Sequence, residues 1–430
     1  MRPSLLVASL LWAAATGAQS YTSWFTGNAT DAQAEPLGGA CLMGGASEND
    51  EAMRWFLQRA GGGDVLVLRA TGSNGYNNYF YSALGVPLNS VETIRFNSPA
   101  AANDPYVHER IQRAEAIWFA GGDQWTYVSY WRDTPVMTLI NEAIDQRGIA
   151  IGGTSAGMAI LGGMYFAAQN GTVTSATALA NPYHPAVTVQ NQPFLQVPWL
   201  GEVITDTHYD APDRRGRHMV FLARAITDWG VEAKGIACNE YTAVCIAPDG
   251  TARVYGEWPQ YPEYAYFVQA NCLFPQGPEA CAPGSPLTWH HGGQAVKACR
   301  VPGTMQGSNT FSLADWRTTS GGEWQHWSAS GGVFSATPGE VASDCDTGWD
   351  EGPASAPRLR PDGSGHGWLI CGMPGLDHLQ VVDATGRRLP ARVERTPEGA
   401  RFSLHAGPPR LAVAIADAPG RRAVFRIVLP

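Results

Sequence analysis

A serine lies at the centre of a short glycine-rich stretch between two apolar segments. Gly153-Thr-Ser155-Ala-Gly157 follows apolar residues 149–151 and precedes apolar residues 158–161. This G-x-S-x-G spacing predicts a nucleophile elbow, a tight turn from strand to helix that holds a serine hydroxyl clear of the backbone. The alternative is a glycine-rich turn without a chemical role, because such short patterns also arise by chance. We take Ser155 as the candidate nucleophile.

A serine hydroxyl is a weak nucleophile and needs a base beside it. His208 follows the predicted strand 203–206, so it lies at a strand end, as Ser155 does. Strand ends of a parallel sheet meet at one edge, where ligands bind. His208 is therefore the candidate base, and the alternative is a structural histidine on the surface.

The base must itself be oriented by a third group. Glu240 follows another predicted strand, 235–238, and fits that role. Asp206 and Asp210 compete with it, but their closeness in sequence to His208 favours contact with substrate instead. The chain order serine, histidine, acid differs from that of the α/β-hydrolases, in which the acid precedes the histidine. We therefore expect a different fold.

An oxyanion formed by attack on a carbonyl needs backbone donors. The N–H of Ala156, directly after the serine, is one candidate. Gly121 or Gly122 is the candidate for the second, because a glycine turn lets the backbone approach a ligand closely. We expect no metal or cofactor to take part, since no C-x-x-C motif is present and the histidines are scattered.

Strand and helix patterns alternate through the first half of the chain. The predicted strands are continuous apolar runs, which indicates that both faces of the sheet are covered. The predicted fold is α/β, with a doubly wound and mostly parallel sheet. Helices are expected at 48–60, 76–84, 107–116 and 134–146, between strands that begin near Cys41 and at 65–68, 91–96 and 116–120.

The composition divides the rest of the chain into further regions. We predict a signal peptide over 1–20, a catalytic domain over 21–256, an irregular Cys/Trp-rich extension over 257–355 and a small all-β module over 356–430. The apolar run near the N-terminus precedes small-residue cleavage sites, which favours export to the periplasm or the exterior. An uncleaved N-terminal anchor is the alternative, and no later segment predicts a membrane span.

The net charge of −9 does not suggest a nucleic-acid-binding protein. Eight cysteines in an exported chain favour disulfides. Cys272 and Cys281 flank a short loop and are candidates for a local pair, whereas Cys299, Cys345 and Cys371 are candidates for links in the C-terminal half.

Several stretches of the chain carry a resemblance when they are taken together. They are Ala116-Ile-Trp-Phe-Ala-Gly-Gly-Asp-Gln124, Gly152-Gly-Thr-Ser-Ala-Gly157, Asp206-Thr-His-Tyr209, Arg214-Arg-Gly-Arg217 and Lys234-Gly-Ile-Ala-Cys-Asn-Glu-Tyr-Thr-Ala243. This set resembles the S51 serine peptidases, and within that family the cyanophycinases. The resemblance covers roughly residues 40–256 and implies a class I glutamine-amidotransferase-like fold. It also implies Ser155 as nucleophile, His208 as base and Glu240 as its orienter, with substrate-binding positions at Gln124, Asp206, Arg214 and Arg217.

The resemblance implies a substrate as well. Cyanophycinases release β-Asp-Arg dipeptides from multi-L-arginyl-poly-L-aspartate. Arg214 and Arg217 suit forked hydrogen bonds to substrate carboxylates, and Asp206 suits an amine or a guanidinium. The alternative for the arginines is a solvated helix start.

The chain also departs from the family pattern. Thr207 stands where glutamine is common, Asn239 where aspartate is common, and residues 211–213 where a further arginine is usual. These departures leave two alternatives open: an aspartyl or isoaspartyl dipeptidase, or a non-catalytic extracellular binding protein. The expected partner is a peptide rich in Asp and Arg, and the family resemblance leaves a homodimer open.

Overall fold

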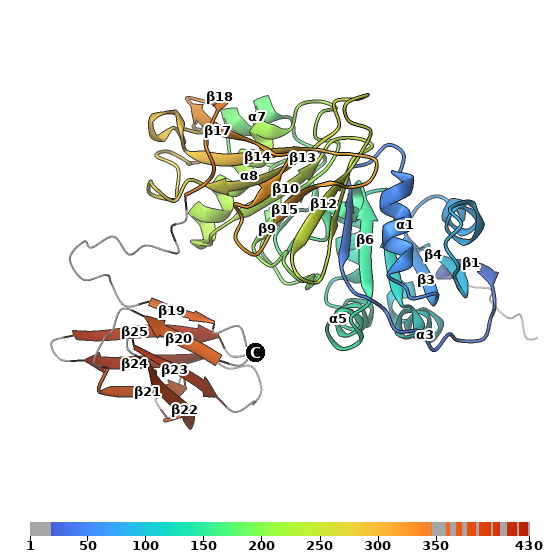
Figure 1. The fold of residues 1–430 in the computed structure, drawn as a ribbon, viewed down its shortest axis with the longest axis horizontal. Coiled ribbons are helices and arrows are strands. Elements are labelled where there is room, and N and C mark those ends of the chain that lie inside the picture. The colour runs from blue at the N-terminus through green and yellow to red at the C-terminus, as the bar shows by residue number, and fades with distance from the viewer. Residues whose placement is uncertain are drawn as a thin grey trace, which may run out of the picture. The chain divides into compact units, whose positions relative to one another are not determined.

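The computed structural model describes most of the chain (Figure 1). The described residues are 19–343, 345, 358–361, 367–371, 376–383, 387–396, 399–404, 411–418 and 421–428. The predicted signal peptide lies outside them, except for its last two residues. The chain divides into two compact units, Met1–Cys345 and Asp346–Pro430. Among the helices of the described residues, none has the length and apolar character needed to cross a bilayer.

A ten-stranded sheet forms the centre of the first unit. Five of its strands are parallel, in the order β4-β3-β5-β6-β2, which confirms the predicted parallel sheet. Each is short and almost fully buried, as the apolar runs of the sequence indicate. Their bounds are β2 Ala40–Met43, β3 Asp64–Arg69, β4 Ser90–Phe96, β5 Ala116–Phe119 and β6 Ala150–Thr154.

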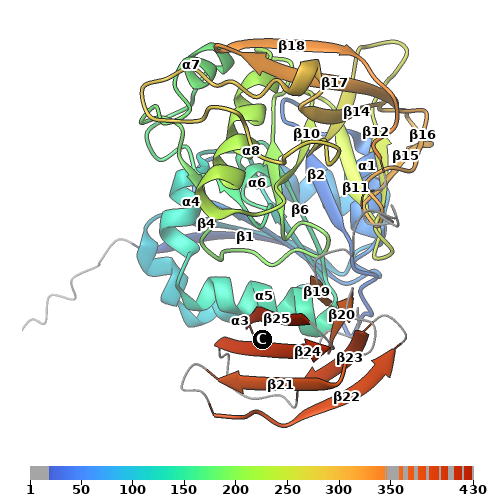
Figure 2. The same cartoon turned by 90° about the vertical axis from the view of Figure 1, so that its left-hand side faces the viewer.

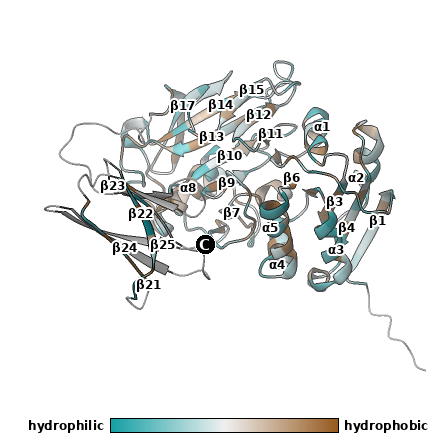
Figure 3. Cartoon of the chain, turned by 60° about the horizontal axis from the view of Figure 1, so that its bottom comes forward, coloured by the Kyte–Doolittle hydropathy of each residue, from teal (hydrophilic) through white to brown (hydrophobic). Residues whose placement is uncertain are grey.

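Helices cover both faces of this sheet. Phe56 of α1 shares a buried cluster with Val67 on one face, whereas Ile140 of α5 shares a second buried cluster with Leu68 on the other. Helices α3 and α5 lie side by side in both views (Figure 1, Figure 2), and α5 carries hydrophilic as well as hydrophobic residues (Figure 3). The helices of this half are α1 Asp50–Gln58, α2 Gly75–Asn78, η1 Tyr79–Ala83, η2 Pro99–Asn103, α3 Pro105–Arg113, α4 Gln124–Trp131, α5 Pro135–Arg147 and α6 Ala156–Ala159.

The described chain begins with an edge strand. Strand β1, Tyr21–Gly27, pairs antiparallel with β4 at the edge of the sheet. Tyr21 stacks on Tyr106 with ring centroids 5.4 Å apart. This strand depends on partners about seventy residues further along the chain, so its short sequence alone gives little signal.

A second, six-stranded sheet carries the strands β9 and β10, in the order β18-β17-β14-β13-β10-β9. The two strands that lead to His208 and Glu240 therefore lie outside the ten-stranded sheet. They are parallel to each other, and helix α8 connects them. Their bounds are β9 Val203–Asp206, α8 Arg215–Trp229 and β10 Lys234–Cys238, and the shorter elements before them are β7 Tyr165–Phe166, α7 Ser175–Ala180 and β8 Val189–Gln190.

The predicted irregular extension is regular over most of its described length. Its strands complete both sheets, beyond the antiparallel hairpin of β11 and β12. Phe267 stacks on Phe311 at 4.1 Å between centroids, so aromatic packing joins the two sheets. The elements are β11 Ala243–Ile246, β12 Thr251–Tyr255, β13 Tyr264–Ala270, η3 His291–Gly293, β14 Val296–Pro302, β15 Asn309–Ser312, β16 Thr319–Ser320, β17 Glu323–Ser330 and β18 Val333–Pro338.

Cys272 pairs with Cys345 across 73 residues, with Cα atoms 6.1 Å apart. The predicted local pair of Cys272 with Cys281 is therefore wrong, and the Cys281 thiol is free. Cys299 is also free and buried, so it makes no link. The side chain of Cys371 lies outside the described residues.

The second unit is all β in its described residues, which confirms the predicted small β module. A four-stranded antiparallel sheet has the order β19-β20-β23-β22, and a three-stranded one has the order β21-β24-β25. Their bounds are β19 Arg358–Pro361, β20 Gly367–Cys371, β21 His378–Asp383, β22 Ala391–Thr396, β23 Gly399–Leu404, β24 Leu411–Ala418 and β25 Arg421–Val428.

Candidate active site

Ser155 occupies a strained turn between β6 and α6. Its φ and ψ angles are 51° and −116°, which a residue with a side chain rarely adopts. The Ser155 N–H donates to the Met43 carbonyl at 3.0 Å, and the Ser155 carbonyl accepts from the Ala159 N–H at 2.9 Å. The backbone is thus held on both sides, which confirms the strand-to-helix turn predicted from the sequence.

The two glycines of the turn are required by close backbone contacts. A Cβ atom added to Gly153 would lie 2.5 Å from the Gly157 carbonyl carbon. One added to Gly157 would lie 2.1 Å from the Phe119 oxygen. Both distances are well below contact between such atoms, so β5, β6 and α6 reach this spacing only with glycine at these positions.

The imidazole of His208 meets the Ser155 hydroxyl. His208 lies just after β9 with a φ of 47°, and its N–H donates to the Gly44 carbonyl at 2.8 Å. Its Nε2 atom is 2.7 Å from Ser155 Oγ. Gly45 lies against the ring, because an added Cβ there would be 2.4 Å from His208 Cε1. The ring is therefore confined from the side of β2.

The Glu240 carboxylate completes the hydrogen-bonded chain. His208 Nδ1 lies 2.7 Å from Glu240 Oε1. The turn that carries Glu240 is itself held, since the Glu240 N–H donates to the Asp210 carboxylate at 2.9 Å and the Tyr241 N–H donates to the Gly45 carbonyl at 3.0 Å. Asp210 thus contacts the backbone beside Glu240 and not the imidazole. The structure brings together the three residues predicted to do chemistry.

Gly44 and Gly45 support the site, a role that no motif of the sequence indicates. Their carbonyls hold the backbone of His208 and of Tyr241. A Cβ added to Gly44 would lie 2.0 Å from the Asn239 oxygen. The available signal was the Gly-Gly pair directly after the first predicted strand, but nothing local indicates which loops will pack on it.

Asp206 and Arg217 lie in the interior and pair with each other. Their side chains are 3% and 4% exposed, and Arg217 Nε donates to Asp206 Oδ2 at 2.9 Å. Arg217 also donates to Thr172 Oγ1 and to the Val173 carbonyl, both at 3.1 Å. Burial alone would raise the pKa of Asp206, but the charge and hydrogen bonds of Arg217 lower it below its usual value. This arrangement does not support the prediction that the two residues contact substrate, because their polar atoms already form hydrogen bonds with each other.

Arg214 is placed differently. It immediately precedes α8, and its Nη1 donates to the Thr207 carbonyl at 3.0 Å, whereas its buried Nε has no hydrogen-bond partner. Burial and the neighbouring Arg217 lower the pKa of Arg214, and Asp206 and Glu240 act against them. An arginine remains charged under such shifts. A partly desolvated cation with an unused donor favours an anionic ligand.

The glycine turn after β5 lies beside the serine. A Cβ added to Gly121 would be 3.6 Å from Ser155 Cβ. The Tyr127 hydroxyl is 2.9 Å from the Ala120 carbonyl and 3.0 Å from the Gly121 carbonyl, so it anchors this turn. Gln124 is the first residue of α4, and its Nε2 is 3.5 Å from the Phe166 carbonyl. That contact is too long to fix the amide firmly.

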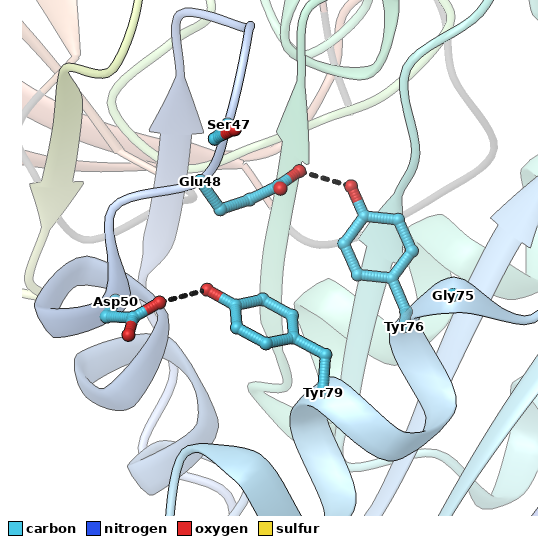
Figure 4. Close-up of a pocket in the computed structure, with 6 residues that line it drawn as sticks. All are labelled: Ser47, Glu48, Asp50, Gly75, Tyr76 and Tyr79. Atoms are coloured by element: carbon cyan, nitrogen blue, oxygen red, sulfur yellow. Dashed lines mark hydrogen bonds between the residues drawn. The ribbon is translucent and has the colours of Figure 1, made fainter.

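A separate pocket of about 440 Å³ opens near the start of α1 (Figure 4). The Tyr79 hydroxyl donates to Asp50 at 2.7 Å, and the Tyr76 hydroxyl donates to Glu48. Burial, together with these carboxylates, raises the pKa of both tyrosines, so both are neutral donors. The pocket contains none of the predicted site residues and is lined by Ser47, Glu48, Asp50, Gly75, Tyr76 and Tyr79.

Comparison with known proteins relates part of the chain to one family. The model of peptidase family S51 matches residues 43–180. A cyanophycinase of Synechococcus elongatus is 25% identical over 232 residues, which are 50% of this chain but only 64% of that protein. A cyanophycinase of Geminocystis herdmanii is 24% identical over 226 residues, or 50% of this chain and 76% of its own length.

A solved peptidase from an acI-B1 Actinobacterium covers 54% of this chain and 94% of its own, at 18% identity. Its TM-score of 0.38 is too low to bear on the fold. Ser155 lies inside the range that the family model matches, whereas His208 and Glu240 lie beyond it. The fold is α/β, and one part of the chain, residues 43–180, is similar to peptidase family S51.

Proposed function

We propose that this protein is a serine-type exopeptidase that hydrolyses cyanophycin to β-Asp-Arg dipeptides. One observation carries the proposal: Ser155, His208 and Glu240 form a continuous chain of two 2.7 Å hydrogen bonds, with the serine on a strained turn. Nucleophile, base and orienting acid need this geometry for acyl transfer. The substrate follows from the likeness to cyanophycinases of cyanobacteria.

In the proposed reaction the Ser155 hydroxyl attacks the scissile carbonyl carbon. His208 Nε2 accepts the hydroxyl proton and then donates it to the leaving amine. Glu240 keeps the proton on Nδ1 of the imidazole and stabilises the positive charge that forms there. Water, activated by the same imidazole, then hydrolyses the acyl-enzyme and restores the free serine.

The negative oxygen of the tetrahedral intermediate needs donors near Ser155. The Ala156 N–H is available because the first N–H groups of a helix have no partner within it. We propose the Gly122 or Gly121 N–H as the second donor, since this turn lies beside the serine. Donors of this kind contribute about 3–4 kcal/mol each to stabilising the transition state.

We propose Arg214 and Gln124 as the substrate-binding side chains. The unused Nε of Arg214 suits a substrate carboxylate, and the loosely held amide of Gln124 suits a peptide group. Asp206 and Arg217 would instead support the chain segment that carries His208. The N-terminal segment suggests that the enzyme acts in the periplasm or outside the cell.

Insoluble cyanophycin incubated with the purified protein tests the proposal directly, with the soluble products analysed by mass spectrometry. We expect β-Asp-Arg to be released, and expect the rate to fall by roughly ten-thousandfold or more for Ser155→Ala. Ser129→Ala is a matched control, because Ser129 lies on α4 and bonds only to the Thr126 carbonyl.

Equal activity of Ser155→Ala and the wild type would overturn the serine mechanism. Hydrolysis of short isoaspartyl peptides without release from the polymer would keep the mechanism and replace the substrate. In that case Thr207 and the segment 211–213 would be the first positions to vary, since they depart from the family pattern.

A further inference from the structure

Two buried cysteines face each other across neighbouring strands of the ten-stranded sheet. Cys41 of β2 is directly opposite Cys245 of β11 in an antiparallel register. Their sulfur atoms are 3.6 Å apart and neither side chain is exposed to solvent. Both are free thiols in this structure. Nothing in the proposed peptidase reaction uses them.

The backbone geometry of this pair fits a disulfide. Directly opposed residues of antiparallel strands have Cα atoms about 4.5 or 5.5 Å apart, depending on the type of pair. Both separations lie within the range of about 4.4–6.8 Å observed for disulfides. Side-chain rotation, without movement of the strands, then suffices to bring the sulfurs together. We propose that Cys41 and Cys245 are a disulfide site that closes when the protein folds in the presence of a disulfide oxidant.

Cys238 is the competing partner, and the structure separates it from the pair. The Cys238 thiol contacts the Leu42 carbonyl at 3.6 Å, and it belongs to the apolar cluster that contains Leu42. Cys41 and Cys245 belong to the cluster on the opposite face of β2, with Met43. Side chains of a strand alternate between faces, so Cys41 points away from the cluster that contains Cys238.

The chemistry is ordinary thiol–disulfide exchange. One cysteine thiolate attacks a sulfur of oxidised glutathione, and a glutathione thiolate leaves. The second cysteine thiolate attacks the mixed disulfide and releases the second glutathione. Two electrons pass from the cysteines to the glutathione disulfide, and the two cysteine protons end on the two glutathione thiols. This must precede burial, because the folded protein shields both sulfurs.

The bond would tie together the strands that hold the Glu240 turn. β2 leads directly to Gly45, and β11 begins two residues after Tyr241. The Tyr241 N–H already donates to the Gly45 carbonyl at 3.0 Å, so the loops are linked at one point. A covalent link between Cys41 and Cys245 would prevent the two strands from separating. Burial also raises the pKa of the Cys245 thiol, which slows exchange after folding.

The test is to refold the denatured, reduced protein in oxidised or in reduced glutathione, and then to unfold it and alkylate all free thiols. Peptide mapping by mass spectrometry reads each cysteine. We expect labelling at Cys41 and Cys245 to fall roughly tenfold in the oxidised sample, with recovery of the cross-linked peptide pair. Cys272 and Cys345 are the positive control, and Cys299 is the buried thiol that should stay labelled in both samples.

Full labelling of Cys41 and Cys245, in a sample in which Cys272 and Cys345 are linked, would overturn the proposal. A cross-link from Cys41 to Cys238 would overturn it too. Cys41→Ala provides a second measurement: oxidation should raise the midpoint of thermal unfolding of the wild type by several degrees more than that of the variant. An equal shift in both proteins would show that the pair contributes no bond, whatever the peptidase activity.

Discussion

Two polar clusters lie two residues apart at the end of β9, and they differ mainly in burial. The Asp206–Arg217 pair is 3–4% exposed, whereas His208 and Glu240 are 24% and 28% exposed. Both clusters join a carboxylate to a basic side chain by short hydrogen bonds. The buried pair has its polar atoms satisfied inside the protein, whereas the half-exposed chain ends in a serine hydroxyl beside solvent. Burial therefore separates a group that supports structure from one that can react.

The difference follows from physical chemistry. A buried charge is tolerated only when it is paired and hydrogen-bonded. Arg217 meets this condition through Asp206, Thr172 and Val173. His208 has only Ser155 and Glu240 on its ring nitrogens, and a substrate can reach the first of them. Changes to the His208–Glu240 cluster should therefore reduce activity, and changes to the Asp206–Arg217 pair should reduce stability.

The largest effect is expected for Glu240→Gln. The amide keeps the shape but cannot stabilise the imidazolium or hold the productive tautomer, so kcat/KM should fall by about ten-thousandfold. The free energy of unfolding in urea should change little, because Glu240 is only partly buried. Glu142→Gln, an exposed carboxylate on α5, is the matched control. A loss below tenfold would remove Glu240 from the proposed mechanism.

Arg217→Met should, in contrast, lower stability. Leaving Asp206 buried without its partner should lower the free energy of unfolding by about 3–5 kcal/mol. The neighbouring Arg215→Met breaks an ion pair with the exposed Asp213 and should cost under about 1 kcal/mol. Asp206→Leu combined with Arg217→Met should cost less than Arg217→Met alone. If Arg217→Met unfolds like the wild type yet binds substrate poorly, the original prediction of a substrate contact would stand.

Gly45→Ala should affect the half-exposed cluster through packing. The new methyl would lie 2.4 Å from His208 Cε1, at a φ of +115°, so the imidazole must move. A displacement of this kind at a catalytic base costs about a hundredfold in rate. Gly201→Ala is the control, because nothing lies within 4 Å of its added Cβ. Unchanged kinetics for Gly45→Ala would show that the ring is not confined from this side.

The smallest effect is expected for the pH dependence of stability, through the buried His218. His218 is fully buried, with its ring nitrogens near the Tyr209 hydroxyl and the Ile204 carbonyl, and burial lowers its pKa. Below the ordinary histidine value of about 6.5 the unfolded chain takes up a proton that the folded protein does not. Stability should therefore fall with decreasing pH, by up to about 1.4 kcal/mol per unit from this group.

Urea unfolding of the wild type and of His218→Gln at pH 8 and pH 5 measures the contribution of His218 to this loss of stability. The variant should lose less stability between the two values. Glu115, whose pKa burial raises to about 7, contributes with the opposite sign but equally in both proteins. Asp206, with its lowered pKa, loses its contribution only as the pH falls below the ordinary aspartate value of about 3.9. If the wild type and the variant lose the same free energy of unfolding between pH 8 and pH 5, His218 is not the source of the pH dependence.

Features of this protein that depend only on neighbours along the chain could be predicted from the sequence. The G-x-S-x-G spacing predicted the turn at Ser155, because glycine is needed where backbones approach closely. Apolar runs predicted the parallel strands, and strand ends then indicated His208 and Glu240 as partners. Each of these inferences uses local rules of backbone conformation and hydrophobic burial, and the geometry agrees with them.

Packing of the whole chain determines which polar groups are buried and which strands share a sheet. Asp206 and His208 are two residues apart and equally polar, yet only Asp206 meets an arginine in the interior. The strands of segment 264–338 have little periodicity because their stability comes from pairing with distant strands and from aromatic packing. The pairing of Cys272 with Cys345 likewise depends on chain segments 73 residues apart. Contacts between distant residues follow from the whole packed arrangement, which no short stretch of sequence contains.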